Sequence, residues 1–171
     1  GDYECYIGMY PRGALSFYVL SRDQLLLYHN KIAVFDELNF IDEINPMVAF
    51  TENGSDLQFK NILGIVEFKI TGTGNIVSLK VTVDKGEYIS GMFLLDVPTC
   101  TLTPYTDKST YFDANTNYSF ISAGLKEPIT LSSTPRSIYA LLPPGTYHNL
   151  SVQTIDDTGM LTTRTATNDI T

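Results

Sequence analysis

Several residue types that often carry catalysis or recognition are scarce in this sequence. The 171 residues include no tryptophan, two histidines and two cysteines, Cys5 and Cys100. Two cysteines are too few for a disulfide framework, and their spacing does not match a zinc site. Two buried free thiols or one disulfide are the alternatives. Neither cysteine has a histidine or basic cluster beside it, which argues against a nucleophilic thiol.

Positive charge and long apolar runs are also lacking. Eleven lysines and arginines face nineteen aspartates and glutamates, for a net charge of −8. This charge repels phosphate backbones and anionic lipid, so binding to nucleic acid or a membrane surface is not expected. No apolar run reaches the roughly 18 residues that a transmembrane helix needs. The chain begins at Gly1-Asp2 without a methionine, which indicates a trimmed mature or expressed segment.

The residues that are abundant favour strands. Eleven tyrosines, nine phenylalanines and many threonines and valines suit pleated, half-buried surfaces. A hydrophobic content of 43% with 18% charged residues is typical of a folded domain. We therefore predict an all-β protein with antiparallel strands and take residues 1–171 as a single unit, although length does not decide between one domain and two small β modules. Strands are expected at residues 3–10, 15–21, 64–72, 77–84, 88–97, 117–124, 137–143, 146–155 and 160–167.

The clearest strand pattern covers residues 64–84. Val66, Phe68 and Ile70 alternate with polar residues, and Val77, Leu79, Val81 and Val83 do the same. Residues 72–75, with the sequence Gly-Thr-Gly-Asn, separate the two runs. The pattern predicts a β-hairpin with one face in water and the three valines and one leucine of the second run facing inward.

Three other segments predict different structure. Residues 36–44 have Leu38, Ile41 and Ile44 at helical spacing before Pro46, which predicts at most one short helix. Residues 51–56 form a polar, glycine-bearing break and are the candidate boundary if the chain divides into modules. Residues 99–117, rich in threonine, aspartate and tyrosine, are expected to form a long irregular connection.

Glycines and aspartates near the C-terminus are expected to form turns. Pro143-Pro144-Gly145 suits a type II turn, in which the glycine takes a positive φ. Residues 156–159, Asp-Asp-Thr-Gly, suit a hairpin turn between two strands. Adjacent carboxylates at Asp156 and Asp157 also lack the alternate spacing of a calcium loop, so a turn is favoured over a metal site.

No set of residues in the sequence has the pattern of an active site. His29 and His148 have no histidine partner at metal-binding spacing, so neither a catalytic nor a metal role is expected. The pair Gly72 and Gly74 lacks the third glycine of a dinucleotide-binding turn. Four acidic residues lie on the outer face of the predicted helix: Asp36, Glu37, Asp42 and Glu43. We expect them to be solvated surface residues rather than a glycosidase site, because the two acids of such a site normally come from separate elements. We expect no catalytic, cofactor-binding or metal-binding residues, and no cofactor.

Tyrosines and sequons give two weaker signals. A group of tyrosines could stack against sugar rings, although sugar-binding sandwiches usually present tryptophan. Packing within strands is therefore the favoured role for Tyr3, Tyr6, Tyr10, Tyr18 and Tyr28. Glycosylation sequons occur at Asn53, Asn117 and Asn149, about the number that chance gives in a chain rich in serine and threonine.

Three passages of the sequence share one pattern of strands and turns. In residues 6–24, Tyr-Pro precedes an apolar strand and a glutamine. Residues 45–83 contain Pro-Met and then Phe-Lys-Asn before an amphipathic pair of strands. Residues 131–167 contain Leu-Pro-Pro-Gly-Thr-Tyr before the last strands. Together these passages resemble the fimbrillin-like (FimA/Mfa-type) surface proteins of the Bacteroidales. Two features depart from the pattern: residues 2–5 are not a lipobox, and the last strand ends early.

This resemblance implies a transthyretin-like β-sandwich that is exported to the cell surface or outer membrane, with a lipid anchor in the full-length precursor. It implies assembly with other fimbrial-type subunits, or binding of a surface ligand, by strand addition. In that mode main-chain hydrogen bonds supply affinity and alternate side chains supply specificity. We expect the interaction at the N-terminal strand (residues 3–10) or the C-terminal strand (residues 160–167).

Two other classes of function remain as alternatives. A carbohydrate-binding accessory domain of a glycan-uptake system would need an exposed aromatic pair on one face or loop. An enzyme would need a pocket that holds His29 or His148 against a carboxylate. The sequence favours a non-enzymatic surface adhesion or fimbrial-type protein.

Overall fold

The structure, a computed structural model, describes residues 6–10, 16–29, 34–35, 45–52, 54, 56–106 and 117–171. Within these ranges the chain is all-β and contains no helix, which confirms the predicted fold class. The helix predicted at residues 36–44 lies outside the described residues. None of the described residues forms a helix long and apolar enough to cross a membrane.

The strands pair into four sheets, and every pairing is antiparallel. Sheet orders are β1-β5-β6, β10-β9-β3-β2, β11-β8-β13-β14 and β4-β12-β7. The strands are β1 (Tyr6–Tyr10), β2 (Ser16–Val19), β3 (Gln24–His29), β4 (Val34–Phe35), β5 (Met47–Thr51), β6 (Lys60–Asn61), β7 (Gly64–Ile70), β8 (Asn75–Thr82), β9 (Gly91–Asp96), β10 (Thr101–Pro104), β11 (Phe120–Thr130), β12 (Arg136–Leu142), β13 (Ser151–Asp156) and β14 (Leu161–Thr165).

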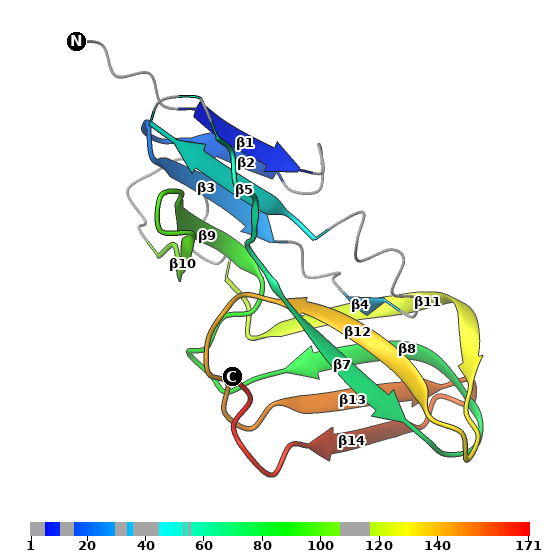
Figure 1. Ribbon diagram of the computed structural model, residues 1–171. Coiled ribbons are helices and arrows are strands. Elements are labelled where there is room, and N and C mark those ends of the chain that lie inside the picture. The colour runs from blue at the N-terminus through cyan, green and yellow to red at the C-terminus, as the bar shows by residue number, and fades with distance from the viewer. Residues whose placement is uncertain are drawn as a thin grey trace.

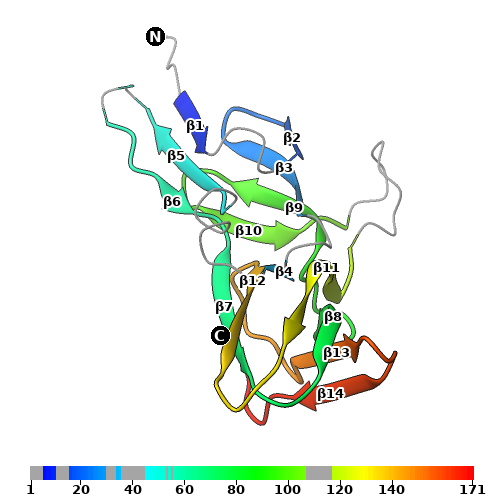
Figure 2. The ribbon, with the colours of Figure 1, turned by 90° about the vertical axis from the view of Figure 1, so that its right-hand side faces the viewer.

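The four sheets form two halves (Figures 1 and 2). The first two sheets make the upper half of Figure 1, and the last two make the lower half. Each half has its own buried apolar cluster. Leu25, Leu27 and Leu95 belong to the upper cluster, and Leu79 and Val81 belong to the larger lower cluster. Burial of such aliphatic side chains is the main force that holds facing sheets together.

The chain passes between the two halves several times. Strands β1 to β3, β5, β6, β9 and β10 lie in the upper half, and the others lie in the lower half. Residues 51–56, the candidate module boundary, connect β5 to β6, which pair with each other in one sheet. The two halves are therefore interleaved along the sequence.

The hairpin predicted for residues 64–84 is wrong in its pairing. Both strands form, but β7 pairs with β12 and β8 pairs with β11 and β13. The glycine-rich connection therefore crosses from one sheet to the facing one. Gly72 and Gly74 have φ of 154° and 94° and supply the required backbone geometry. The alternation of apolar and polar residues indicates which face of each strand is buried, but it does not indicate which strand is the neighbour.

The faces of β7 and β8 follow the prediction with one exception. Glu67 and Lys69 are exposed, whereas Leu79 and Val81 are fully buried. Val77 is only half-buried, and Ile76 takes the core position in its place. The register against β13 skips a residue at this point, and such a bulge turns the strand's side chains to the opposite face.

Three smaller predictions also need correction. Residues 99–117 contain β10, which the sequence did not indicate. The strand expected from residue 146 begins only at Ser151, because Asn149 has a φ of 48° and interrupts the extended backbone. Gly145 does not have the positive φ that a type II turn requires, whereas Gly159 does, at 87°, in the confirmed hairpin turn between β13 and β14.

Candidate functional site

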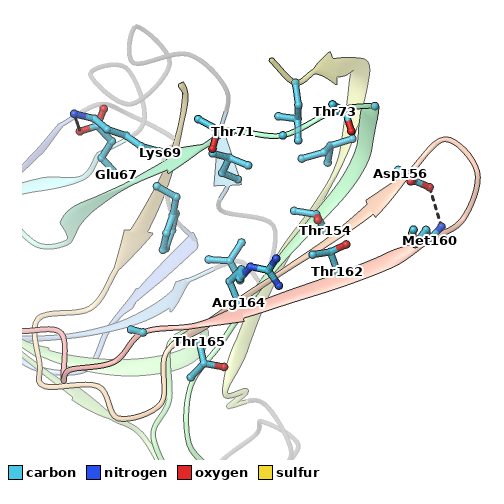
Figure 3. A pocket seen from close by; sticks show the side chains of 18 of the residues that line it. Glu67, Lys69, Thr71, Thr73, Thr154, Asp156, Met160, Thr162, Arg164 and Thr165 are labelled. Atoms are coloured by element: carbon cyan, nitrogen blue, oxygen red, sulfur yellow. Dashed lines mark hydrogen bonds and ion pairs between the residues drawn. The ribbon is translucent and has the colours of Figure 1, made fainter. Parts of the chain in front are cut away.

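The main concave feature of the described residues is a groove between two sheet edges. Strand β7 is bonded to β12 on one side, and β14 is bonded to β13 on one side, so each is the edge of its sheet. The groove between them has a volume of about 680 Å³ and is lined by β7, the connection to β8, β13 and β14 (Figure 3). We call it the β7–β14 groove. Its size is in the range of ligand-binding pockets.

The inner part of the β7–β14 groove is apolar. Val66, Phe68 and Ile70 on β7 pack against the lower core cluster while they line the groove. Val152 on β13 does the same, as does Leu131, which lies beside Gly72. These side chains are only partly buried, because β7 and β14 leave the seam between the two sheets open. An occupant with apolar side chains would complete their burial.

Strand β14 supplies the polar wall of the groove. Thr162 pairs with Thr154 and Arg164 pairs with Val152 across the β13–β14 ladder, so their side chains lie on the inner face of the sheet. Both line the groove, and Figure 3 shows Arg164 in the space between β14 and β7. Thr163, on the opposite face, does not line it.

Charges at the two ends of the groove are already compensated. Lys69 Nζ lies 3.8 Å from Glu67 Oε2, and the Ser137 hydroxyl donates to Glu67 Oε1 at 2.6 Å. The Ser137 hydrogen bond, helped by Lys69, lowers the pKa of Glu67. At the other end, the hydroxyl and backbone N–H of Thr158 and the N–H of Met160 donate to Asp156 Oδ1, and the Thr158 hydroxyl contributes most to the lowered pKa of Asp156.

The two adjacent aspartates hold the turn, as the sequence indicated. Asp156 accepts the turn's N–H groups, and Asp157 Oδ2 accepts a hydrogen bond of 2.8 Å from Asn75 Nδ2. These bonds tie the β13–β14 turn to the start of β8. Within the described ranges, no group of three or more histidine, cysteine, aspartate or glutamate side chains is placed to hold a metal ion.

His29 lies in the interior between the two halves. It is the last residue of β3, is 4% exposed, and its Nε2 donates to the Leu141 carbonyl of β12 at 3.0 Å. Burial lowers the pKa of His29 to about 4, although the Leu141 bond opposes this shift. The ring is therefore neutral at pH 7 and links β3 of the upper half to β12 of the lower half.

His148 instead lies on the surface beside two carboxylates. Its Nδ1 contacts Glu87 Oε1, its Nε2 lies 3.5 Å from Asp169 Oδ2, and its backbone N–H donates to Glu87 Oε2 at 3.0 Å. The Glu87 hydrogen bond, with the charge of Asp169, raises the pKa of His148. His148 does not line the β7–β14 groove.

The rings of one aromatic pair in the described part of the chain are inclined at 61° to each other rather than coplanar. Tyr118 and Phe120 lie edge to face at 5.4 Å, and Lys80 Nζ lies 4.6 Å above the Phe120 ring. The lysine thus occupies a ring face that a sugar would need. Tyr18 is 52% exposed on β2 and Tyr28 is half-buried on β3. Tyr3 and the side chains of Tyr6 and Tyr10 lie outside what the structure describes.

The thiol and the sequons differ in their surroundings. Cys100 is free, has a φ of 56° in the β9–β10 turn, and burial raises the pKa of its thiol. Cys5 lies outside the described residues, as does Asn53. The Asn117 side chain is bonded to Met92 N and to Tyr105 O, whereas Asn149 is exposed.

Searches against protein-family models, curated proteins and solved structures found no significant match to this chain. The assignment of the β7–β14 groove as a candidate site therefore depends on its geometry alone. The sequence did not identify it, because it forms between β7 and β14, which are about ninety residues apart. One signal was present: β14 reads Leu-Thr-Thr-Arg-Thr, which places polar residues on both faces of a strand, as an edge allows.

Proposed function

We propose that this protein is a non-enzymatic surface adhesion or fimbrial-type protein that binds an extended partner segment in the β7–β14 groove. The observation that supports this proposal is the pair of edge strands on either side of an apolar groove. An unpaired strand edge offers a row of free N–H and C=O groups, which is the template for strand addition. An added strand would also cover the partly buried side chains of β7 and β13.

Two further features support the proposal. The C-terminal strand expected to interact, residues 160–167, contains β14, whose five residues are all exposed. The other expected strand, residues 3–10, contains β1, which pairs with β5 alone and is also a sheet edge. The resemblance to fimbrillin-like proteins adds a transthyretin-like topology, export to the cell surface and fimbrial subunits as partners to the proposal.

A carbohydrate-binding accessory domain is the second candidate. Hydroxyls of Thr71, Thr73, Thr154 and Thr162 line the groove and could bind sugar hydroxyls. The aromatic pair Tyr118 and Phe120 does not favour it, because Lys80 covers the Phe120 ring. Strand addition therefore explains more of the groove, since it uses the backbone edges as well as the side chains.

Hydrogen exchange tests the proposal with a defined probe. The probe is a capped seven-residue peptide of alternating threonine and valine, mixed with the whole chain at increasing concentration. We expect slower exchange of the amides of β7 or β14, because an added strand bonds to them. The same peptide with N-methyl groups on alternate residues lacks half of its donors and should give no protection.

Two neighbouring threonines provide a matched pair of variants. Thr162→Lys puts a long cation into the groove, whereas Thr163→Lys puts the same side chain on the opposite face of the same strand. We expect Thr162→Lys to remove the protection and Thr163→Lys to keep it. Equal binding by both variants, or unchanged exchange of β7 and β14 in the original chain, contradicts strand addition in this groove.

A further inference from the structure

We propose that the β7–β14 groove selects an extended segment carrying a carboxylate opposite Arg164, with apolar side chains two residues to either side. This inference rests on the proposed function, because it specifies the chemistry of the added strand. It concerns the one place where the groove presents a cation to an occupant rather than to another residue of the chain.

Arg164 is directed into the groove by the strand that carries it. The ladder pairs Arg164 with Val152, and Val152 packs on the lower core, so both side chains lie on the inner face of the sheet. Among the described residues, the guanidinium makes one hydrogen bond, from Nη1 to the Thr163 carbonyl at 3.1 Å. A guanidinium has five N–H donors, so most of them are left for an occupant.

The charge of Arg164 is not compensated within the described part of the protein. The ion pairs there join Lys69 to Glu67 and His148 to Glu87 and Asp169, and none includes Arg164. Asp156, the other carboxylate of the groove, is engaged by the N–H groups of its own turn. An anionic group that enters the groove therefore meets a free guanidinium rather than an occupied one.

The neighbouring surface determines what should surround that carboxylate. Phe68 and Ile70 on β7, with Val152 on β13, line the groove and are only partly buried. Side chains of a strand that face the same way recur every second residue. The favoured occupant thus has an aspartate or glutamate with valine-like residues at the second position on each side. A planar carboxylate can accept two parallel bonds from a guanidinium, which favours it over a neutral amide.

An inward-pointing charge on an edge strand has a second known role, as a guard against edge-to-edge aggregation. The two roles differ in how they depend on the sign of the charge. A charge that prevents aggregation does so whether it is positive or negative, because burial of any unpaired charge is costly. Recognition of a carboxylate needs a cation. Arg164→Glu therefore separates the roles, since it keeps a charge at the same place and reverses its sign.

The test uses three capped peptides, Thr-Val-Thr-Asp-Thr-Val-Thr and its versions with asparagine or lysine in place of aspartate. Dissociation constants are measured by calorimetry in 50 mM salt, with exchange of the β7 and β14 amides as the check on location. We expect the aspartate peptide to bind about tenfold more tightly than the asparagine peptide. Arg164→Glu should reverse the order and favour the lysine peptide.

Lys85→Glu is the control for net charge. Lys85 is exposed and does not line the groove, so its reversal changes the net charge by the same amount as Arg164→Glu. It should leave the order of the three peptides unchanged. Raising the salt to 300 mM should narrow the difference between the peptides in the original chain.

The outcomes distinguish this inference from the proposed function. Equal affinity of the three peptides, with protection of β7 or β14, overturns the role of Arg164 and leaves strand addition standing. Failure of all three peptides to protect either strand overturns both. An acidic oligosaccharide such as oligogalacturonate that protects the groove and depends on Arg164, where the peptides do not bind, replaces the peptide occupant with a glycan.

Discussion

The buried imidazole of His29 predicts a specific loss of stability in weak acid. Its pKa in the folded chain is about 4, against the ordinary histidine value of 6.5. Between these two values the unfolded chain binds a proton and the folded chain does not. The unfolding free energy therefore falls as the pH falls from 6.5 to 4, and it is independent of this residue above that window.

The size of the effect follows from the two pKa values. A difference of about 2.5 pKa units corresponds to about 3 kcal/mol once the pH is below both. At pH 5 the proton is already bound by nearly all unfolded chains, and the loss is about 2 kcal/mol relative to pH 7. This loss of about 2 kcal/mol is roughly an eighth to two fifths of the 5–15 kcal/mol that stabilises an ordinary domain.

The assay is urea unfolding at pH 7 and pH 5 for the original chain and for His29→Gln. Glutamine keeps an N–H donor for the Leu141 carbonyl and does not titrate. The chain has eleven tyrosines and no tryptophan, so tyrosine fluorescence reports the transition. The loss between the two pH values should be about 2 kcal/mol greater in the original chain. An equal loss in both proteins would refute the reasoning, because the carboxylates contribute the same to each.

Other predictions concern the surface histidine, the core and a turn. Because Glu87 raises the pKa of His148, its contribution to stability is full below pH 6.5 and is lost as the pH rises through the raised value. His148→Asn should therefore differ from the original chain in urea unfolding at pH 5.5 and match it at pH 9. Leu79→Ala, at a fully buried core position, should cost about 2–5 kcal/mol in the same assay, whereas Thr163→Ala on the exposed face should stay within about 0.5 kcal/mol. Gly159→Ala should cost about 1 kcal/mol through its φ of 87°, since the space around it is open, and a stability equal to the original chain would contradict the turn.

The sequence predicted faces of strands better than their partners. Phe68 and Leu79 were placed correctly because alternation of apolar and polar residues is a local property. The partner of β7 was predicted wrongly as β8, because the true partner, β12, lies about seventy residues away and no local pattern indicates it. A four-residue connection with two glycines serves equally for a hairpin and for a crossing between facing sheets.

Chemistry at the ends of strands was also difficult to predict. β10 was not expected, because its Thr-Leu-Thr-Pro sequence has only one apolar residue. β13 starts late because Tyr147 pairs with Ile170 and His148 binds Glu87 instead of continuing the ladder. The aspartates of the β13–β14 turn were interpreted correctly, since turn chemistry is local.

The β7–β14 groove could be predicted only in its parts. Arg164 and the threonines of β14 are visible in the sequence as polar residues on both faces of a strand. Their position opposite Phe68 depends on which sheets face each other, and that depends on the crossing between β7 and β8. Long-range pairing therefore creates the site, and the sequence supplies only its components.

The interleaved order of the strands has a consequence for how the chain is made. β8 lies between β11 and β13, so one of its two edges can be paired only after residues 151–156 have been made. When the chain is synthesised or exported with its N-terminus first, that edge of β8 therefore stays unpaired until residue 156 has emerged. Such late, long-range closure is slow and leaves an exposed strand in the meantime. We therefore expect a nascent chain that ends before residue 150 to require a chaperone, or to aggregate, in a way that the chain extending to residue 171 does not.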